Sequence, residues 1–455
     1  MCGPCKWTRI GKPWHFRIAV WIGCPVWYTE SIMTTAIIVT IFILGYAAIT
    51  LEHSIKVNKA ASALVTGILC WTVHVLSGVD AHSVNHALAE QMGELSGILF
   101  FLLGAMVIVE LVDAHDGFDI ITSRITTSSK RKLLWIVATM AFFLSSLLDN
   151  LTTTIVVVTL LRKLIADRED RLLFTGVTVI AANAGGVWSP MGDVTTTMLW
   201  IGGQISVLPT ITSLLIPSMV CSLVPVIAVS LRLQGSISSP PGKRAELLSS
   251  SDFERKAVFW LGLAVLLFVP MFKSITHLPP FMGMLFGLGV MWVLTELIHS
   301  EKGEAEKGVL SVNHAIRKID TPSILFFLGI LLAISALQTT GILQSVAVWL
   351  QSLVGDVVIL GLIIGLLSAV FDNVPLVAAV QGMYSLSMYP MDDFFWQFLA
   401  YTSGTGGSAL IVGSAAGVAA MGLEKINFFW YVRTISFLAV MGYLSGAAVF
   451  VIQKT

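Results

Sequence analysis

The sequence contains few charged residues. Only 12% of its 455 residues are Asp, Glu, Lys or Arg, whereas a soluble protein carries about 25%. Hydrophobic residues make up 56%, and the mean hydropathy is +0.85. So little charge excludes both an ordinary globular domain and a disordered chain, and the composition therefore predicts an integral membrane protein.

The sequence also lacks net charge and has little cysteine. The 27 Lys and Arg residues balance the 27 Asp and Glu residues, which excludes the basic face that nucleic-acid binding requires. Cys2 and Cys5 form a Cys-Gly-Pro-Cys motif, but no βαβ pattern surrounds it, and the other three cysteines lie in or beside apolar stretches. The sequence therefore predicts no nucleic-acid partner, no redox role and no cofactor.

Long apolar runs are plentiful. A run of about 17 to 22 apolar residues can cross a hydrocarbon core as a helix. Eight such runs lie near residues 31–50, 60–78, 95–112, 209–231, 257–273, 280–298, 322–338 and 428–451. Four further apolar regions, 133–165, 172–201, 355–388 and 395–420, are interrupted by polar or glycine-rich clusters. The expected fold class is an all-α polytopic membrane protein.

The distribution of Lys and Arg predicts the orientation in the membrane. We interpret 133–165 and 355–388 as re-entrant hairpins, and 172–201 and 395–420 as crossings with a broken middle. Nearly all basic residues after residue 30 then fall on the inner side, with Lys273 and Lys454 outside. The tail, residues 1–30, falls outside although it carries four basic residues. It is a signal-like segment that is removed, an extraneous segment ahead of a translation start at Met33, or a tail on the membrane surface.

The chain contains an internal repeat. Four strings occur in the same order in both halves: Asn-His-Ala at 85–87 and 313–315, ILFFL at 98–102 and 324–328, Asp-Asn at 149–150 and 372–373, and Gly-Gly at 185–186 and 406–407. Each half has five crossings and one hairpin, and an odd number of crossings inverts the second copy. We therefore expect inverted repeats at 31–233 and 257–455, joined by a cytoplasmic linker at 234–256, as in secondary transporters.

The interruptions place carboxylates in apolar surroundings. Asp149 and Asp372 lie at the two hairpin tips, and Asp193 follows the first broken helix. An ionised Asp at the centre of a membrane helix costs about 2.5–3.5 kcal/mol, so each must be protonated or paired with a cation. Neither tip motif contains Lys or Arg. Asp193 has a plainer alternative role, as the N-cap of the following half-helix.

Acids without a basic partner indicate a cation site. Hard cations prefer oxygen ligands, so we predict that Asp149 and Asp372 transiently bind a small hard cation such as Na⁺. Neutral oxygen ligands near the breaks are Asn150, Thr152, Thr153, Asn183, Ser189, Thr195, Asn373, Ser403, Thr405, Ser408 and Ser414. If a carboxylate must hold either a proton or a cation whenever the site changes sides, exchange transport follows.

Four motifs carry a family resemblance. LLDNLTTT, NAGGVWSPMGDVTTTMLW, FDNVPLVAA and SGTGGSALIVGSAAGVAAMG occur in this order at the predicted breaks. They resemble the motifs of NhaD-type sodium/proton antiporters, within the ion transporter superfamily. The resemblance covers nearly everything from about residue 31 onward, while residues 1–30 depart from the pattern.

The resemblance implies exchange of Na⁺ or Li⁺ for H⁺, and a fold with two re-entrant hairpins and two broken helices. Carried over position by position, it implies these ion-binding residues: Ser145, Asp149, Asn150, Asn183, Asp193, Thr195, Thr196, Ser368, Asp372, Asn373 and Ser403. The expected setting is a bacterial inner membrane or an organellar membrane, with a role in pH homeostasis. A homodimer is compatible with this interpretation.

Two other functions fit part of the pattern. An anion carrier of the same superfamily, for dicarboxylates or oxyanions, would share the repeats and hairpins, but its hairpin tips typically offer neutral Ser, Asn and Thr groups. An intramembrane aspartyl protease would use two Asp residues, but it requires neither duplicated hairpins nor an Asn beside each Asp. The Asp at both tips favours a secondary antiporter that is not an enzyme.

Overall fold

The computed structural model describes residues 25–454 except 51, 123, 124, 126, 238–250, 301–307, 309 and 371. Across these residues the structure is helical, and the only β pairing is an isolated bridge between Ser129 and Ser236. Most of the predicted tail and the middle of the predicted linker lie outside the described residues.

Nine helical stretches in the described part of the chain are long and apolar enough to cross a membrane. They are α1 (Pro25–Thr50), α3 (Lys59–Leu76), α4 (Ala81–Ala114), α6 (Lys130–Leu148), α10 (Val207–Arg232), α11 (Asp252–Thr276), α12 (Pro280–Ile298), α15 (Thr321–Thr339) and the stretch Phe428–Lys454, which contains α21 (Phe428–Tyr431) and α22 (Phe437–Lys454). Eight of them confirm the eight predicted crossings. The ninth, α6, forms the first arm of the predicted first hairpin.

The remaining helices are shorter. They are α2 (Glu52–Ile55), α5 (Asp119–Thr122), α7 (Asn150–Leu164), α8 (Arg168–Val187), α9 (Val194–Ile201), α14 (Val312–Lys318), α16 (Ile342–Val354), α17 (Val357–Leu367), α18 (Asn373–Met383), α19 (Phe394–Gly406) and α20 (Ala415–Glu424). All four predicted interruptions are real breaks between helices. They separate α6 from α7, α8 from α9, α17 from α18, and α19 from α20.

Local sequence explains where many of these helices begin. The Asn58 side chain accepts a hydrogen bond from the Ala60 N–H (2.8 Å) at the start of α3, and Ser251 and Glu254 form a capping box at the start of α11. Such side chains satisfy N–H groups that have no partner within the helix. The faces of α11 and α12 that carry Trp260 and Phe286 are exposed, as expected of surfaces that contact lipid.

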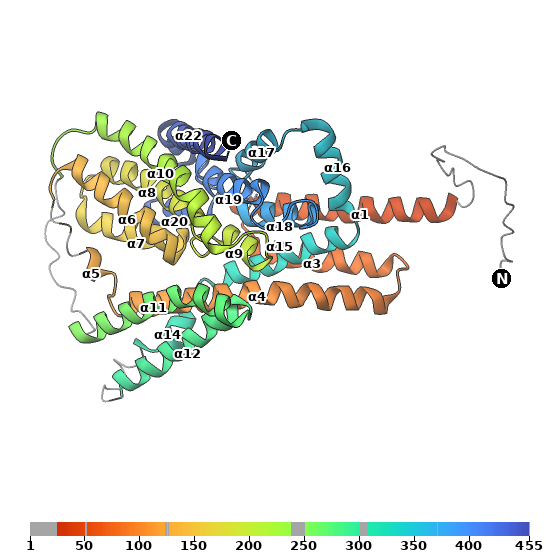
Figure 1. Ribbon diagram of the computed structural model, residues 1–455, viewed down its shortest axis with the longest axis horizontal. Helices are drawn as coiled ribbons and strands as arrows, with labels where there is room; N and C mark the ends of the chain where they lie inside the picture. The colour runs from red at the N-terminus through yellow and green to blue at the C-terminus, as the bar shows by residue number, and fades with distance from the viewer. Residues whose placement is uncertain are drawn as a thin grey trace.

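The two halves of the chain interlock around the breaks (Figure 1). Helix α10 packs against α22, and α3 packs against α15. The second arm of each hairpin packs against the second segment of the other half's broken helix, α7 against α20 and α18 against α9. In Figure 1, α6 and α7 lie to the left, whereas α17 and α18 lie near the middle of the long axis and α16 lies to their right.

The second hairpin region differs in detail from the first. Helices α6 and α7 pack against each other, whereas α17 packs mainly on α19 and α18 mainly on α15 and α16. Helix α17 is also bent by 118° relative to α16, across a short break at Gly355. Helices α17 and α18 therefore do not pack on each other as α6 and α7 do, because each packs on different neighbouring helices.

Candidate functional site

Two helices approach very closely where α8 breaks. A Cβ atom added to Gly185 would lie 2.1 Å from the carbonyl oxygen of Phe142 in α6, and one added to Gly186 would lie 2.4 Å from the oxygen of Gly192. Both distances are far shorter than real Cβ contacts. Only glycine therefore allows α6 and α8 to pack at this distance.

The same contacts recur at the equivalent positions of the second half. A Cβ at Gly406 would lie 2.0 Å from the oxygen of Gly365, and one at Gly407 would lie 2.6 Å from that of Gly413. The predicted site residue Ser145 donates a hydrogen bond from its hydroxyl to the Ala182 carbonyl (2.6 Å). Its counterpart Ser368 donates to the Ser403 carbonyl (3.0 Å). The two halves thus use one scheme to hold a hairpin against a broken helix.

This packing predicts a strong position dependence for glycine substitutions. Gly185→Ala and Gly406→Ala each force a methyl group against backbone, and overpacking costs about 1–3 kcal/mol. Gly93→Ala in α4, where nothing lies within 4 Å of the added Cβ, should be neutral or slightly stabilising because alanine favours helix. Thermal unfolding of the purified protein in detergent, followed by tryptophan fluorescence, measures the difference. Equal midpoints for all three variants would contradict the close packing.

Asp149 forms the whole connection between α6 and α7. Its backbone has φ 87° and ψ 161°, a conformation that costs a non-glycine residue about 1–3 kcal/mol. One carboxylate oxygen accepts a hydrogen bond from the Thr152 N–H (2.7 Å), and the other accepts one from the Thr152 hydroxyl (2.9 Å). The side chain therefore caps α7 while remaining partly exposed.

Asp193 is almost completely buried, with 1% of its surface exposed. Its Oδ1 accepts hydrogen bonds from the N–H and the hydroxyl of Thr195, both at 2.9 Å, and so caps α9. Its Oδ2 accepts a hydrogen bond from Nδ2 of Asn150 at 2.7 Å. The capping role is thus confirmed, and the same carboxylate also connects the first hairpin to the first broken helix.

Asn183 extends this network into the second half of the chain. Its Oδ1 accepts a hydrogen bond from Nδ2 of Asn150 (3.1 Å). Its own Nδ2 donates to the hydroxyls of Ser408 and Ser414, both at 2.9 Å. Ser414 caps α20 and occupies the position that is equivalent to Asp193 in the repeat. Side chains beside three of the four breaks are therefore joined by one set of buried hydrogen bonds.

Asp372 brings the second hairpin tip to the same region. Its carboxylate accepts a hydrogen bond from the Val374 N–H (3.2 Å) and caps α18, while Asn373 beside it is buried. Helix α18 packs against α9, which Asp193 caps, and Asp193 in turn accepts the hydrogen bond from Asn150, the residue after Asp149. Tyr46 of α1 also interacts with Asp372.

The three acids do not form a compact metal cage. In the part of the chain that the structure describes, no three His, Cys, Asp or Glu side chains converge closely enough to hold a metal ion. A cation bound here would therefore take much of its coordination from neutral oxygens, as hard cations readily do. Thr153 offers one such oxygen, because its fully buried hydroxyl has no hydrogen-bond partner among the described residues.

The other predicted site residues support the breaks rather than contact the carboxylates. Thr196 donates to the carbonyls of Ser189 and Asp193, both at 2.9 Å. The Ser403 hydroxyl donates to the Leu399 carbonyl at 2.7 Å. Ser408 and Ser414 were predicted only as general oxygen ligands, although the alignment of Ser414 with Asp193 between the two halves would have identified Ser414 as a helix cap.

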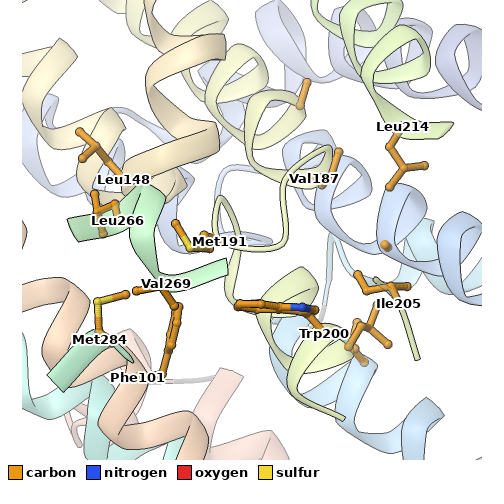
Figure 2. Packing of buried hydrophobic residues seen from close by; sticks show 14 of the residues in the cluster. Phe101, Leu148, Val187, Met191, Trp200, Ile205, Leu214, Leu266, Val269 and Met284 are labelled. Carbon is orange, nitrogen blue, oxygen red and sulfur yellow. The ribbon is translucent and has the colours of Figure 1, made fainter. Parts of the chain in front are cut away.

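Apolar side chains close the region around the first break. Figure 2 shows Leu148 at the end of α6, Val187 at the end of α8 and Met191 within the break, all in one buried cluster with Trp200. This cluster continues to Phe101, whose ring meets that of Trp200 edge-on with centroids 6.4 Å apart. With apolar groups packed around the break, the polar groups within it must satisfy one another or a ligand.

The chain is similar to known transporters. The family described as "Citrate transporter" matches residues 32–406. "Sodium/proton antiporter 1" and "Sodium/proton antiporter 2" of Arabidopsis thaliana are 49% and 47% identical, over 90% and 89% of this chain and 71% and 96% of their own lengths. "Na(+)/H(+) antiporter NhaD" of Halomonas elongata is 30% identical, over 91% of this chain and 87% of its own length.

A solved structure supports the fold. The YdaH transporter of Alcanivorax borkumensis matches with a TM-score of 0.54 over 92% of this chain and 97% of its own, at 11% identity. The named relatives are transporters rather than enzymes, and the helices long enough to cross a membrane agree with an integral membrane protein. The chain belongs to the citrate transporter family and, within it, to the NhaD-type sodium/proton antiporters.

Proposed function

We propose that this protein is a secondary antiporter that exchanges Na⁺ or Li⁺ for H⁺ by alternating access. The observation that carries the proposal is that Asp149, Asp193 and Asp372 cap three of the helices that begin at the breaks, with no Lys or Arg forming an ion pair with them among the described residues. Carboxylates in such a position are stable only when a cation or a proton neutralises them.

Competition for these carboxylates produces the exchange. Asp149 and Asp372 are partly exposed, whereas Asp193 is buried and accepts three hydrogen bonds. The two tip acids are therefore the groups that take up and release ions, with Asn150, Asn373 and Thr153 as further oxygen ligands. Asp193 and Asn183 hold the tips in place. A site that can hold a cation or a proton, but not both, couples the two fluxes.

Alternating access would come from two inverted repeats, residues 31–233 and 257–455, with the linker 234–256 between them. Equivalent backbone contacts at Gly185 and Gly406, and at Gly186 and Gly407, support the duplication. The separation of α6–α7, at the left of Figure 1, from α16–α18, in its middle and right, agrees with hairpins that enter from different sides. In transporters with this architecture, one repeat moves against the other around a fixed site.

The family description favours one competing function, the transport of citrate or a similar anion. Anions bind at helix N-termini, where N–H groups are free and the helix dipole is positive. In this chain the carboxylates of Asp149, Asp193 and Asp372 already cap α7, α9 and α18. A citrate anion would meet negative charge at three of the four helix starts around the breaks, so the site supports a cation.

Transport in acid-loaded inverted membrane vesicles tests this proposal. Addition of NaCl or LiCl is expected to make the vesicle interior more alkaline, and KCl and citrate are expected to have no effect. The readout is a pH-sensitive dye, compared with vesicles that lack the protein. A response to citrate alone would establish the anion carrier instead.

A further inference from the structure

A cavity of about 490 Å³ lies beside the site. Its walls come from α4, α7 and α20, together with the residues at the start of α3 and of α15. In the predicted topology, the starts of α3 and α15 and the end of α4 lie on the face of the basic loops, whereas α7 and α20 begin at the breaks. The lining thus includes residues from one end of the predicted path to the other. Ile155 and Val418 line it and are 40% and 39% exposed, although both are apolar.

The end of the cavity nearest the helix breaks lies directly beside the site. Thr152 lines the cavity, and its hydroxyl and N–H donate the two hydrogen bonds that Asp149 accepts. Ala415, from the second half of the chain, also lines the cavity. It directly follows Ser414, whose hydroxyl accepts a hydrogen bond from Asn183. An ion in the cavity is thus separated from the Asp149 carboxylate by one threonine side chain.

The opposite end of the cavity is charged. Its lining contains four carboxylates, those of Glu52, Glu110, Asp113 and Asp320, and two lysines, Lys59 and Lys318. The Lys318 ammonium lies 3.2 Å from Oε1 of Glu110, and its side chain is 48% exposed. Lys318 also attracts the Asp113 carboxylate. The other ammonium, that of Lys59, lies 4.6 Å from the centre of the Phe326 ring.

We propose that this cavity is the route by which a hydrated monovalent cation reaches Asp149 from the face that carries the basic loops. In this route the Lys318–Glu110 ion pair sets the local cation concentration. The positive charge of the Lys318 ammonium partly neutralises the nearby carboxylates, which would otherwise attract the transported ion more strongly. This inference rests on the proposed cation/proton exchange and adds the residues that control access on one side.

Kinetics in inverted vesicles, whose outer surface is this face, test the role of the ion pair. Lys318→Met should lower the apparent KM for Na⁺ about two- to fourfold at low ionic strength, and Glu110→Gln should raise it by a similar factor. The maximal rate should not change, and an inert salt should remove both effects by screening. Lys256→Met is the matched control, because Lys256 forms an ion pair with Asp252 (2.6 Å) away from the cavity. Its KM should equal that of the wild type.

Thiol labelling tests the route itself. In a variant without the five natural cysteines, Ile155→Cys should react with a membrane-impermeant thiol reagent added to inverted vesicles. Val293→Cys in α12 is the control, since Val293 is 61% exposed and does not line the cavity. It should not react, because a thiol that faces lipid is not reached by an aqueous reagent.

The two proposals can fail separately. Absence of cation-dependent proton movement in the wild type would overturn the antiporter function, whatever the labelling shows. Normal exchange by the wild type, with Ile155→Cys unlabelled or with the same KM in Lys318→Met as in the wild type, would overturn the access route and leave the antiporter function standing.

Discussion

Asp149→Asn and Asp372→Asn are each expected to reduce sodium-dependent proton release to the level of vesicles that lack the protein. An amide neither binds a proton at physiological pH nor carries the negative charge that attracts a cation, so it cannot be the exchanging group. Asparagine caps helices about as well as aspartate, so α7 and α18 should keep their starts. The measurement is the dye response of acid-loaded vesicles, together with the amount of protein in the membrane.

Asp356→Asn is the matched control for these two variants. Asp356 caps α17 by accepting hydrogen bonds from the Val358 and Ile359 N–H groups at 2.8 and 2.9 Å, and it lies away from the site on an exposed turn. Its replacement should leave the exchange unchanged. Wild-type exchange in Asp149→Asn or in Asp372→Asn would show that the corresponding carboxylate is not an exchanging group.

Asp149→Gly adds a test that separates folding from transport. The φ of 87° at residue 149 is costly for aspartate but not for glycine. Glycine at an N-cap loses only a few tenths of a kcal/mol compared with aspartate. We therefore expect a protein at least as stable as the wild type that does not exchange sodium for protons. A large fall in the unfolding midpoint would instead identify the Asp149 carboxylate as mainly structural.

Glu424→Ala is expected to lower the free energy of unfolding by about 3 kcal/mol, near the low end of the range for breaking a buried ion pair. The Glu424 side chain is only 2% exposed, and its two oxygens lie 2.6 Å from Nε of Arg162 and 2.8 Å from Nε of Arg171. Removal of the acid leaves two arginines facing each other without their shared partner. The loss is not larger because the Arg162 side chain is 45% exposed and can turn toward water.

The position of Glu424 links this loss of stability to the site. It is the last residue of α20, while Arg162 lies in the last turn of α7 and Arg171 in the first turn of α8. The other ends of these three helices meet at the breaks. Loosening the ion pairs should therefore also weaken transport, and the unfolding midpoint and the exchange rate of Glu424→Ala should fall together.

Asp252→Ala provides the control for Glu424→Ala. Asp252 also binds two basic residues, Arg255 at 3.0 Å and Lys256 at 2.6 Å, but its side chain is 66% exposed. Water and salt already screen these pairs, so its removal should change the midpoint much less. If both variants unfold at the same temperature, the ion pairs of Glu424 with Arg162 and Arg171 have no special role in stabilising the packing of α7, α8 and α20.

Much of the fold follows from composition because the membrane imposes simple rules on the sequence. Runs of apolar residues predicted eight crossings, and polar or glycine-rich clusters within apolar runs predicted the four breaks. Both predictions were confirmed because the backbone of a membrane protein can leave a helix only where protein or water satisfies it. The bend between α16 and α17, and the separate packing of α17 and α18, could not be predicted in this way, since they depend on the neighbours that each arm meets.

The candidate site, too, was predictable from the sequence only in part. Asp149 and Asp372 were conspicuous as isolated acids at repeated positions, whereas Asp193 had two interpretations, an ion-site residue and a helix cap. The structure confirms the cap and adds a hydrogen bond from Asn150 that was not predicted. The connections from Asn183 to Ser408 and Ser414, from Tyr46 to Asp372, and between Lys318 and Glu110 join residues far apart in the chain. No local pattern marks such pairs.

The sequence by itself determined that this chain spans the membrane, that four short strings recur in both halves, and that its breaks carry acids without Lys or Arg in the same motif. It could do so because solvation by lipid acts on each segment separately. Only the tertiary structure decided which acids are neighbours, which helix starts they cap and which cavity leads to Asp149. These features depend on distances between α4, α7, α9, α18 and α20, and such distances are set by the packing of helices from both halves.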